Sequence, residues 1–301
     1  MKIILSRKGF DSVHGRVPSP VFPDGGALSL PIPARAGPVR FRDVLWKGES
    51  IGPLVEGLTK RRVPGTHSCH LDPDLSAAAL GRQIGWRPAF GQVGSAQGHL
   101  DRNGVGQGDV FLFFGWFRRV QPGQGGLWSY ARNARSVHRL FGWLQVGEVL
   151  RVGAIGTETV DANPWLGTHP HVCGRTWPPN NSLYVAATSL DIDGNETSLP
   201  GAGLLAGLDS RLTLTDPAVN RRTDWRLPPW FWDGVGAPQL TYHRDARRWR
   251  RTPNWSHVRS VSKGQEFVFD AADVPQAMRW VTMLVREFGA SADDSHVRCC
   301  P

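Results

Sequence analysis

The sequence predicts an α+β fold that is rich in strands, with a curved sheet or a small barrel at its core and a few peripheral helices. Three observations favour this class. The chain of 301 residues contains 35 Gly and 23 Pro, which indicates many turns between short elements. Several short apolar runs are bounded by turn residues, as strands usually are. Only a few stretches, residues 273–288 among them, have the apolar spacing of a helix.

The centre of the predicted sheet is the stretch 108–153. Its first apolar run, 108–117, is too short for a helix and almost unbroken, which predicts a strand buried on both faces. The second run, 138–152, shares the tripeptide Phe-Gly-Trp with the first. Because Gly inside a strand often marks a bulge or a close backbone approach, we expect two neighbouring strands of a strongly curved sheet.

The remaining elements follow from the same local patterns. We expect further strands at 2–6, 182–190 and 265–270, one short helix within 41–58, a helix at 75–84 capped by Asp72 or Asp74, and an amphipathic helix at 273–288. These elements together predict a single compact domain over 1–288. Residues 289–301 are small and polar and lack a period, which predicts a disordered tail.

Composition limits the partner and the compartment. The net charge of +9 and the pI near 10 favour an anionic partner, with nucleic acid before membrane, although Arg far outnumbers Lys, as in proteins from GC-rich genomes. Two of the four Cys are adjacent, at 299–300, so no disulfide framework is expected and a reducing cytoplasm is the default. No apolar run reaches the length of a signal peptide or of a membrane span.

The first candidate site residues follow the strand at 2–6. They are Ser6, Arg7, Lys8 and Asp11. Two cations, a carboxylate and a hydroxyl suit the binding of a phosphate or of the sugar edge of a nucleotide. The alternative is a solvated turn in which Asp11 is a local cap.

Two histidine-rich segments, 66–75 and 168–173, carry the candidate catalytic groups. Imidazole gives and accepts a proton near neutral pH, so we predict acid–base catalysis by His70, Asp72, His169 and His171. A metal shell drawn from both segments is the alternative. Three His, two Cys and a carboxylate of the two segments could bind zinc or non-haem iron, with the nitrogen and sulfur ligands from His67, Cys69, His70, His169, His171 and Cys173. The spacings match no standard ligand motif, so we predict no metal site.

Aromatic, amide and basic side chains suggest how a nucleotide could be held. Base recognition is assigned to Phe90, Gln92, Gln97 and His99, with Trp116 as a stacking face and Arg118 as a phosphate contact. Such residues also occur in loops without a ligand, and Trp116 could be core. The nucleic-acid footprint is assigned to Arg247, Arg248, Trp249, Arg250 and Arg251, with a solvated basic face as the alternative.

Five ordered motifs resemble one family. They are I-L-S-R-K-G-F-D-S at 4–12, P-S-P at 18–20, H-L-D-P-D-L at 70–75, G-D-V-F-L-F-F-G-W-F-R at 108–118 and H-P-H-V at 169–172. Together they resemble the bacterial and phage family called nucleotide modification associated domain, type three. That resemblance implies a role in DNA base modification. The Gly-Asp turn and the two strands of 108–153 also resemble the PUA-like superfamily, which implies a small barrel and the reading of modified bases.

The function predicted from these features is a DNA base-modification protein. A base or nucleotide would lie among Phe90, Gln92, Gln97 and His99, with phosphate on Arg7 and Lys8, and a duplex base would have to flip out to reach such a pocket. Two alternatives are a reader of modified bases without turnover and an enzyme acting on a free nucleotide precursor. No phosphate loop of the P-loop or dinucleotide-binding form occurs, and no motif identifies a cofactor.

Overall fold

The computed structural model describes residues 1–123, 127–154, 157–174, 177–192 and 194–290. The helices are α1 (Gly52–Leu58), α2 (Gly94–Arg102), α3 (Thr157–Ala162) and α4 (Pro275–Phe288). The strands of the large sheet are β1 (Lys2–Arg7), β2 (Ser19–Val21), β7 (Ala89–Gln92), β8 (Val110–Pro122), β9 (Trp128–Tyr130), β10 (Val137–Arg151), β11 (Ser182–Ala186), β14 (Ala202–Leu204) and β18 (Glu266–Asp270). The strands of the small sheets are β3 (Ile32–Pro33), β4 (Leu45–Trp46), β5 (Glu49–Ser50), β6 (Cys69–His70), β12 (Ser189–Ile192), β13 (Asn195–Pro200), β15 (Asp224–Leu227), β16 (Trp249–Arg251) and β17 (Ser256–Arg259).

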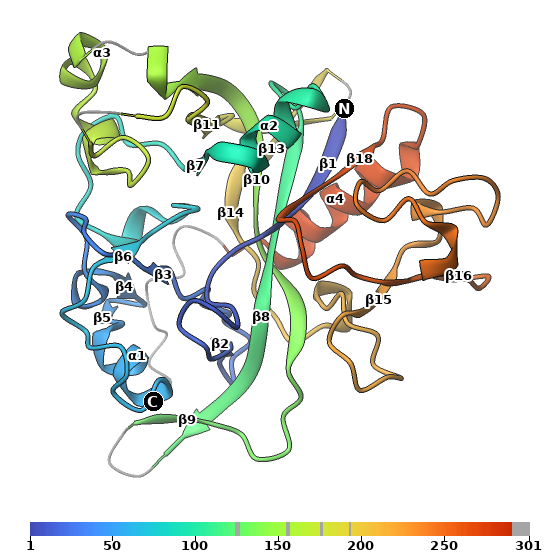
Figure 1. Ribbon diagram of the computed structural model, residues 1–301, viewed down its shortest axis with the longest axis horizontal. Helices are drawn as coiled ribbons and strands as arrows, with labels where there is room; N and C mark the ends of the chain where they lie inside the picture. Colours follow the sequence, from blue (N-terminus) through green and yellow to red (C-terminus); the bar gives the residue numbers. More distant parts are fainter. Residues whose placement is uncertain (124–126, 155–156, 175–176, 193, 291–301) are drawn as a thin grey trace.

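The large sheet is mixed and open. Its strand order is β18-β1-β8-β10-β11-β7, with β2 and β9 added to β8 and β14 added to β10 (Figure 1). β1 and β8 are parallel, whereas β8, β10, β11 and β7 pair antiparallel in turn. Among the strands that the structure describes, no pairing joins β18 to β7. The strand-rich α+β class is therefore confirmed, but the expected alternative of a closed barrel is not found.

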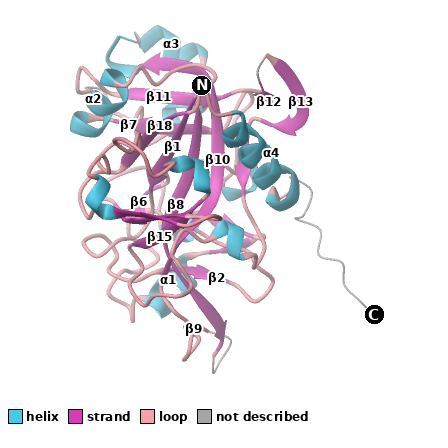
Figure 2. Cartoon of the chain, turned by 90° about the vertical axis from the view of Figure 1, so that its right-hand side faces the viewer, coloured by secondary structure: helices cyan, strands magenta, loops and turns pink. Residues whose placement is uncertain are grey.

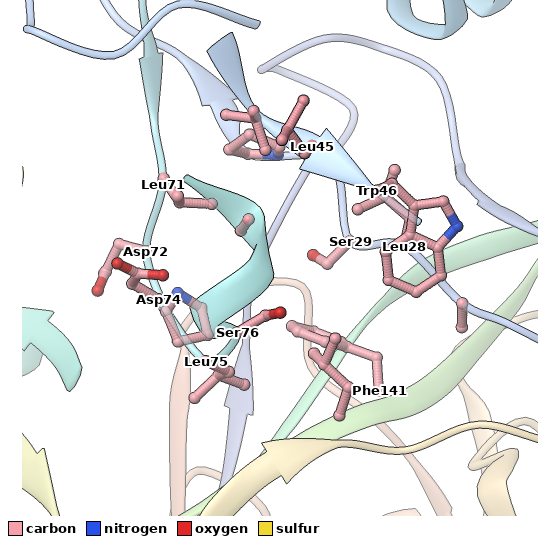
Figure 3. A pocket seen from close by; sticks show the side chains of 16 residues that line it. Leu28, Ser29, Leu45, Trp46, Leu71, Asp72, Asp74, Leu75, Ser76 and Phe141 are labelled. Atoms are coloured by element: carbon pink, nitrogen blue, oxygen red, sulfur yellow. The ribbon is translucent and has the colours of Figure 1, made fainter. Parts of the chain in front are cut away.

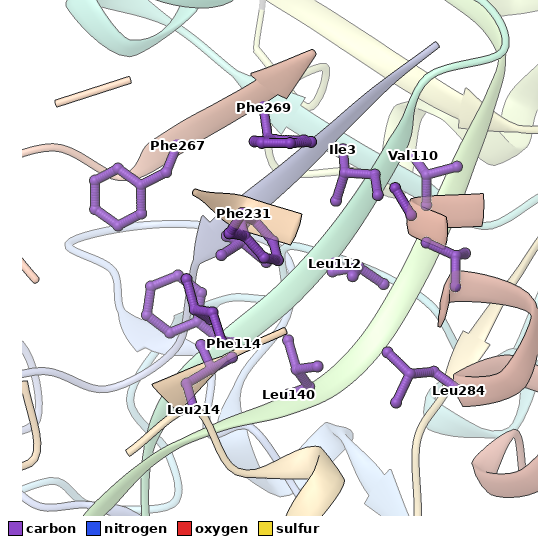
Figure 4. Packing of buried hydrophobic residues seen from close by; sticks show 14 of the residues in the cluster. Ile3, Val110, Leu112, Phe114, Leu140, Leu214, Phe231, Phe267, Phe269 and Leu284 are labelled. Carbon is purple, nitrogen blue, oxygen red and sulfur yellow. The ribbon is translucent and has the colours of Figure 1, made fainter. Parts of the chain in front are cut away.

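The two central strands bury both of their faces, as the sequence predicts. Val110, Leu112 and Phe114 of β8 pack in one cluster with Ile3 of β1 and with α4 (Figure 4). Phe111 and Phe113, which alternate with them, pack in a second cluster with Phe90 and Tyr184. Side chains alternate across a strand, so a strand covered on both faces must be apolar at every position.

The two Phe-Gly-Trp tripeptides also have the predicted consequences. The pairing of β8 with β10 shifts register between Leu140 and Gly142, which is a bulge. A Cβ at Gly142 would lie 2.9 Å from the carbonyl oxygen of Gly203, and a Cβ at Gly115 would lie 2.8 Å from that of Lys8. Both glycines thus permit close backbone approaches, and the second brings the segment after β1 onto β8.

Helix α4 confirms the predicted amphipathic helix and lies along one face of the sheet (Figure 2). Its buried residues Ala277, Val281, Leu284 and Val285 belong to the cluster that contains Ile3. The predicted strands at 2–6, 182–190 and 265–270 correspond to β1, β11 with β12, and β18, and the short helix expected within 41–58 is α1. No described helix is long and apolar enough to cross a membrane.

The helix predicted at 75–84 is wrong, because the segment contains a single 3₁₀ turn, Ala77–Ala79. The Asp74 carboxylate does not cap a helix but accepts two 2.6 Å hydrogen bonds from the Arg82 guanidinium. That guanidinium also lies over the ring of Trp86, 4.2 Å from its centroid. The backbone of Asp74 pairs with Ala89 in an antiparallel bridge, which commits the segment to extended geometry.

The first two residues of the predicted tail, Gly289 and Ala290, form backbone hydrogen bonds. The Gly289 backbone donates a hydrogen bond to the carbonyl of Val285, and Ala290 donates one to the carbonyl of Leu204. These bonds tie the end of α4 to β14. The rest of the predicted tail, 291–301, lies outside the described residues.

Candidate functional site

A cavity of about 430 Å³ opens at the end of β1. We call it the β1 cavity. Among its lining residues are Arg7, Lys8, Asp11, His14, His70, Asp72, Gln92, Trp116, His138, His171 and Arg222. They come from segments distributed over more than 200 residues of the chain. Arg7, Lys8, Asp11, His70, Asp72, Gln92, Trp116 and His171 are candidates that the sequence singled out, and the fold brings them together.

The backbone after β1 positions the first wall of the cavity. The Arg7 amide donates to the carbonyl of Gln265 and the Lys8 amide to that of Phe114, both at 2.8 Å. The chain end is thereby held between the β18 and β8 sides of the sheet. Side chains after the carboxyl end of a strand in a buried sheet are a common location for binding groups.

Lys8 and Glu266 form a buried ion pair at the cavity floor. Lys8 Nζ lies 2.7 Å from Glu266 Oε1 and 4.2 Å from the centroid of the Phe90 ring. Gln92 Nε2 donates to the same carboxylate oxygen at 2.7 Å. Glu266 Oε2 and the buried Ser6 hydroxyl have no hydrogen-bond partner among the described residues. The charge of Lys8 is therefore already neutralised, which differs from the free phosphate-binding cation that the sequence predicts.

Arg7 is also engaged. Its guanidinium donates to the carbonyls of Val261 at 2.8 Å and Ser262 at 2.9 Å, and burial lowers its pKa. The less engaged cation is Arg222, whose guanidinium lies 4.3 Å from the centroid of the Trp116 ring. Arg222 carries no signal in the sequence, because an isolated pair of arginines after a turn belongs to no motif.

The His–Asp cluster, His70, Asp72, His169 and His171, forms the opposite wall. Asp72 Oδ2 lies 3.9 Å from His70 Nε2 and 3.7 Å from His171 Nε2. Asp72 Oδ1 accepts a 2.7 Å hydrogen bond from the Gly91 amide and lies 3.5 Å from His169 Nε2. His70 and His171 line the cavity, whereas His169 is buried behind Asp72.

Hydrogen bonds fix the orientation of two of these imidazoles. Asn181 Nδ2 donates to the carbonyl of His171, so its Oδ1 faces His171 Nδ1 at 2.8 Å and accepts from it. His171 Nε2 is then the unprotonated nitrogen. The His171 amide donates to His169 Nδ1 at 3.3 Å, which leaves the proton of His169 on Nε2, facing Asp72. The sequence does not predict this role of Asn181, since no local pattern links it to a histidine ten residues away.

Burial determines the charge state of the cluster. Burial lowers the pKa of His70 to about 4 and also lowers that of His171, although the Asp72 carboxylate opposes both shifts. Burial would raise the pKa of Asp72, but the hydrogen bond from His169 and the neighbouring imidazoles outweigh it and hold that pKa below its usual range. Near neutral pH, two neutral imidazoles therefore face one carboxylate. Such a group can take up a proton or bind a cation.

Four predicted substrate contacts lie elsewhere. Phe90 and Gln97 are fully buried: Phe90 packs against other aromatic rings of the core, and Gln97 bonds to the hydroxyl of Tyr184. His99 contacts Thr241 at 3.1 Å and packs on Tyr242. Arg118 donates to the carbonyls of Ala131 and Arg132. None of these four side chains lines the β1 cavity, so their role as substrate contacts stays a prediction.

The six-residue metal shell considered from the sequence is not assembled. Cys69 lies in a hydrophobic cluster, whereas His67 and Cys173 are exposed. His70 and His171 are brought together, and Asp72 joins them. One ligand atom from each of these three residues lies within 4.8 Å of the other two. The sequence predicts a catalytic role for Asp72, and it also allows a carboxylate of this segment in the alternative metal shell.

The Arg-rich segment lies on the small sheet β15-β17-β16. Trp249 is buried and its indole donates to the carbonyl of His243 at 2.6 Å, while its side chain also lines a second cavity. Its role in nucleic-acid binding stays a prediction. Arg247 is 91% exposed and pairs with Asp245, and Arg248 and Arg250 line the same second cavity of about 650 Å³. Arg251 is half-buried.

This second cavity adjoins the β1 cavity. The Ser260 amide donates to the carbonyl of Thr223 at 2.8 Å. Thr223 lines the β1 cavity, and the neighbouring Asp224 and Arg259 line the second one. The second cavity contains four arginines, Arg247, Arg248, Arg250 and Arg259, together with the carboxylates Asp216, Asp224 and Asp245.

A small apolar cavity of about 60 Å³ lies behind the His–Asp cluster. Leu28, Trp46 and Phe141 are among its lining residues (Figure 3). The Asp72 side chain points away from Leu28 and Trp46 in this view. The segment after β6 thus lies between this apolar cavity and the polar β1 cavity. Its first carboxylate, that of Asp72, faces the His–Asp cluster in the β1 cavity.

Comparison with known proteins gives one match. No curated protein and no solved structure matches the chain. A family model described as nucleotide modification associated domain 3 matches residues 2–270. The match includes both walls of the β1 cavity and the Arg-rich segment. The chain therefore belongs to the nucleotide modification associated domain 3 family.

Proposed function

We propose that this protein is an enzyme of a DNA base-modification pathway, and that it binds a base or nucleotide in the β1 cavity. The observation that carries the proposal is the convergence of Arg222, Trp116, Gln92 and the His–Asp cluster on one cavity of about 430 Å³. Pockets for small organic ligands are commonly about 300–1,000 Å³. The family membership supports the association with nucleotide modification.

The cavity offers each group that a nucleotide requires. Arg222 supplies a cation for a phosphate, and Trp116 beneath it supplies an aromatic surface. Gln92 donates one Nε2 proton to Glu266 and accepts from the Val93 amide, which leaves its second Nε2 proton for a base edge. His70 and His171 accept or return a proton from the opposite wall, oriented by Asp72 and Asn181.

A polymer substrate is favoured by the arginine-lined surface beside the cavity. Arg248, Arg250 and Arg259 line the second cavity, and the adjacent residues Thr223 and Asp224 line the first and the second cavity, respectively. A DNA strand on this surface would place a flipped-out base at the β1 cavity. An enzyme acting on a free nucleotide would not need these arginines.

The activity is tested by mass spectrometry of nucleosides digested from the DNA of cells that carry the gene. We expect a modified nucleoside with the natural protein and its loss with Asp72→Asn, which removes the charge but can still accept the Gly91 hydrogen bond. His67→Ala, an exposed histidine of the same segment, is the matched control and should retain the product. A folded Asp72→Asn variant that gives the full amount of product contradicts the catalytic assignment.

The salt dependence of DNA affinity tests whether the substrate is DNA or a free nucleotide. The triple change Arg248→Ala, Arg250→Ala and Arg251→Ala should weaken DNA binding and reduce the slope of log K against log salt by about 0.9 for each phosphate contact removed. Arg61→Ala, Arg62→Ala and Arg279→Ala together provide a control of equal charge outside both cavities. Equal DNA affinity of the two triple variants would favour a free nucleotide as the substrate.

A further inference from the structure

We infer that His70, Asp72 and His171 form a binding site for one divalent transition-metal ion, open to the β1 cavity. One ligand atom from each residue lies within 4.8 Å of the other two. The inference goes beyond the proposed function, because binding of the metal requires no nucleotide.

The two oxygens of Asp72 have different surroundings. Oδ1 receives the Gly91 amide at 2.7 Å and faces the Nε2 proton of His169 at 3.5 Å. Oδ2 faces His70 and His171, and it accepts no hydrogen bond from any residue in the described part of the chain. The carboxylate is thus held through one oxygen and presents the other to two imidazoles.

The imidazole of His171 presents a lone pair to this oxygen. Asn181 Oδ1 accepts the proton on Nδ1, so Nε2 is bare and lies 3.7 Å from Oδ2. Two acceptors that face each other in a buried site repel unless a cation lies between them. Lys8 is not that cation, because its ammonium is bound to Glu266 at 2.7 Å.

The donor set and its dimensions suit a transition metal. Two imidazole nitrogens and one carboxylate oxygen bind Zn²⁺, Fe²⁺ or Mn²⁺, which leave further coordination positions for water or substrate. Ligand atoms about 2.1 Å from a tetrahedral ion are about 3.4 Å apart. The two separations between carboxylate and imidazole, 3.7 Å and 3.9 Å, approach this value, and the ligand atoms of the two histidines lie within 4.8 Å of each other. Small side-chain movements would therefore bring the three ligand atoms to metal-binding distances.

A supporting layer holds these ligands in place. Asn181 fixes His171, and His169 together with the Gly91 amide fixes Asp72. Such outer hydrogen bonds fix the tautomer and the direction of metal ligands. His169 is therefore a positioning residue in this site and not a ligand. His70 and His171 line the cavity, so the remaining coordination positions of the metal face the substrate.

The test is the binding of Co²⁺ to the full chain after treatment with a chelator. We expect one equivalent of Co²⁺ per chain with visible d–d absorption, displaced by Zn²⁺, and a raised melting temperature in the presence of the metal. Asp72→Asn and His171→Ala should weaken Co²⁺ binding by more than about 100-fold, and His169→Ala by about 10- to 100-fold. His67→Ala and Cys173→Ser, exposed neighbours in the same two segments, should bind as the natural chain does.

The outcomes are distinct from those of the nucleoside assay. If the natural chain binds Co²⁺ no more tightly than the Asp72→Asn variant, with both shown to be folded by circular dichroism, the metal site is refuted and the cluster is an acid–base group alone. If Co²⁺ binds as expected but no modified nucleoside forms in cells, the metal site stands and the proposed function fails. Loss of Co²⁺ binding in the His67→Ala variant as well would also refute the assignment of His70, Asp72 and His171 as the ligands.

Discussion

Gly91 of β7 lies directly against the imidazole of His171. A Cβ at this position would be 2.3 Å from both Cγ and Cδ2 of the ring, which real contacts do not allow. The glycine also donates its amide to Asp72 Oδ1. One residue without a side chain thus sets the positions of two members of the His–Asp cluster.

We expect Gly91→Ala to displace the His171 ring and to cost about 1–3 kcal/mol of stability through overpacking. Co²⁺ affinity and the modified nucleoside should both fall, measured by titration and by mass spectrometry. The control is Gly98→Ala in α2, where the nearest atom to a new Cβ is the flexible end of Arg102 at 3.3 Å. If the Gly91→Ala variant binds Co²⁺ as tightly as the natural chain, the position of the His171 ring is not critical for metal binding.

At the scale of the element, helix α4 is held by one apolar face. Leu284 is fully buried and packs in the cluster that contains Ile3, Val110 and Leu112 (Figure 4). No residue of α4 lines the β1 cavity. The helix therefore stabilises the sheet without touching the site.

We expect Leu284→Ala to lower the free energy of unfolding by about 3 kcal/mol, the usual cost of a cavity left by a buried leucine. Urea denaturation measures this loss. Arg286→Ala on the exposed side of the same helix should change stability by less than about 0.5 kcal/mol. Co²⁺ affinity should remain natural in both variants, and a large loss in Leu284→Ala would show that α4 and the site are coupled.

At the scale of the whole molecule, stability depends on keeping buried imidazoles neutral. His243 is fully buried; its Nδ1 donates to the carbonyl of Thr241 at 3.0 Å, and its Nε2 accepts from the Val261 amide at 3.2 Å. Both nitrogens are thus satisfied in the neutral form. Burial, with a smaller contribution from the nearby Arg248 and Arg7, lowers the pKa of His243 to about 4, although the hydrogen bond to Thr241 opposes this shift.

The sign of the pH effect follows from this shift. The unfolded chain takes up the proton near pH 6.5, above the folded pKa, so the stabilisation is complete above about pH 6.5 and falls as the pH is lowered. The loss from His243 is about 1.4 kcal/mol per pH unit, or about 2 kcal/mol at pH 5. His243→Gln keeps an acceptor near Val261 but does not titrate. Urea denaturation from pH 7 to pH 5 should show a smaller loss in this variant, and equal losses would contradict the assignment.

The sequence by itself determined the elements whose signal is local. The unbroken apolar runs of β8 and β10 require burial on both faces, and the spacing of Ala277, Val281 and Leu284 requires a helix against a core. The ordered motifs were enough to identify the family, which the match over 2–270 confirms. These features depend on neighbouring residues, so a pattern within one segment specifies them.

Only the tertiary structure decided which candidates share a site. Phe90 and Gln97 look like base-binding residues in the sequence, yet the sheet buries both. Arg82 converts a predicted helix cap at Asp74 into an ion pair. Asp72 meets His171 across about a hundred residues, and Arg222 joins from farther still. Contacts between residues so far apart in the sequence arise when strands pack together. A local sequence pattern does not specify them.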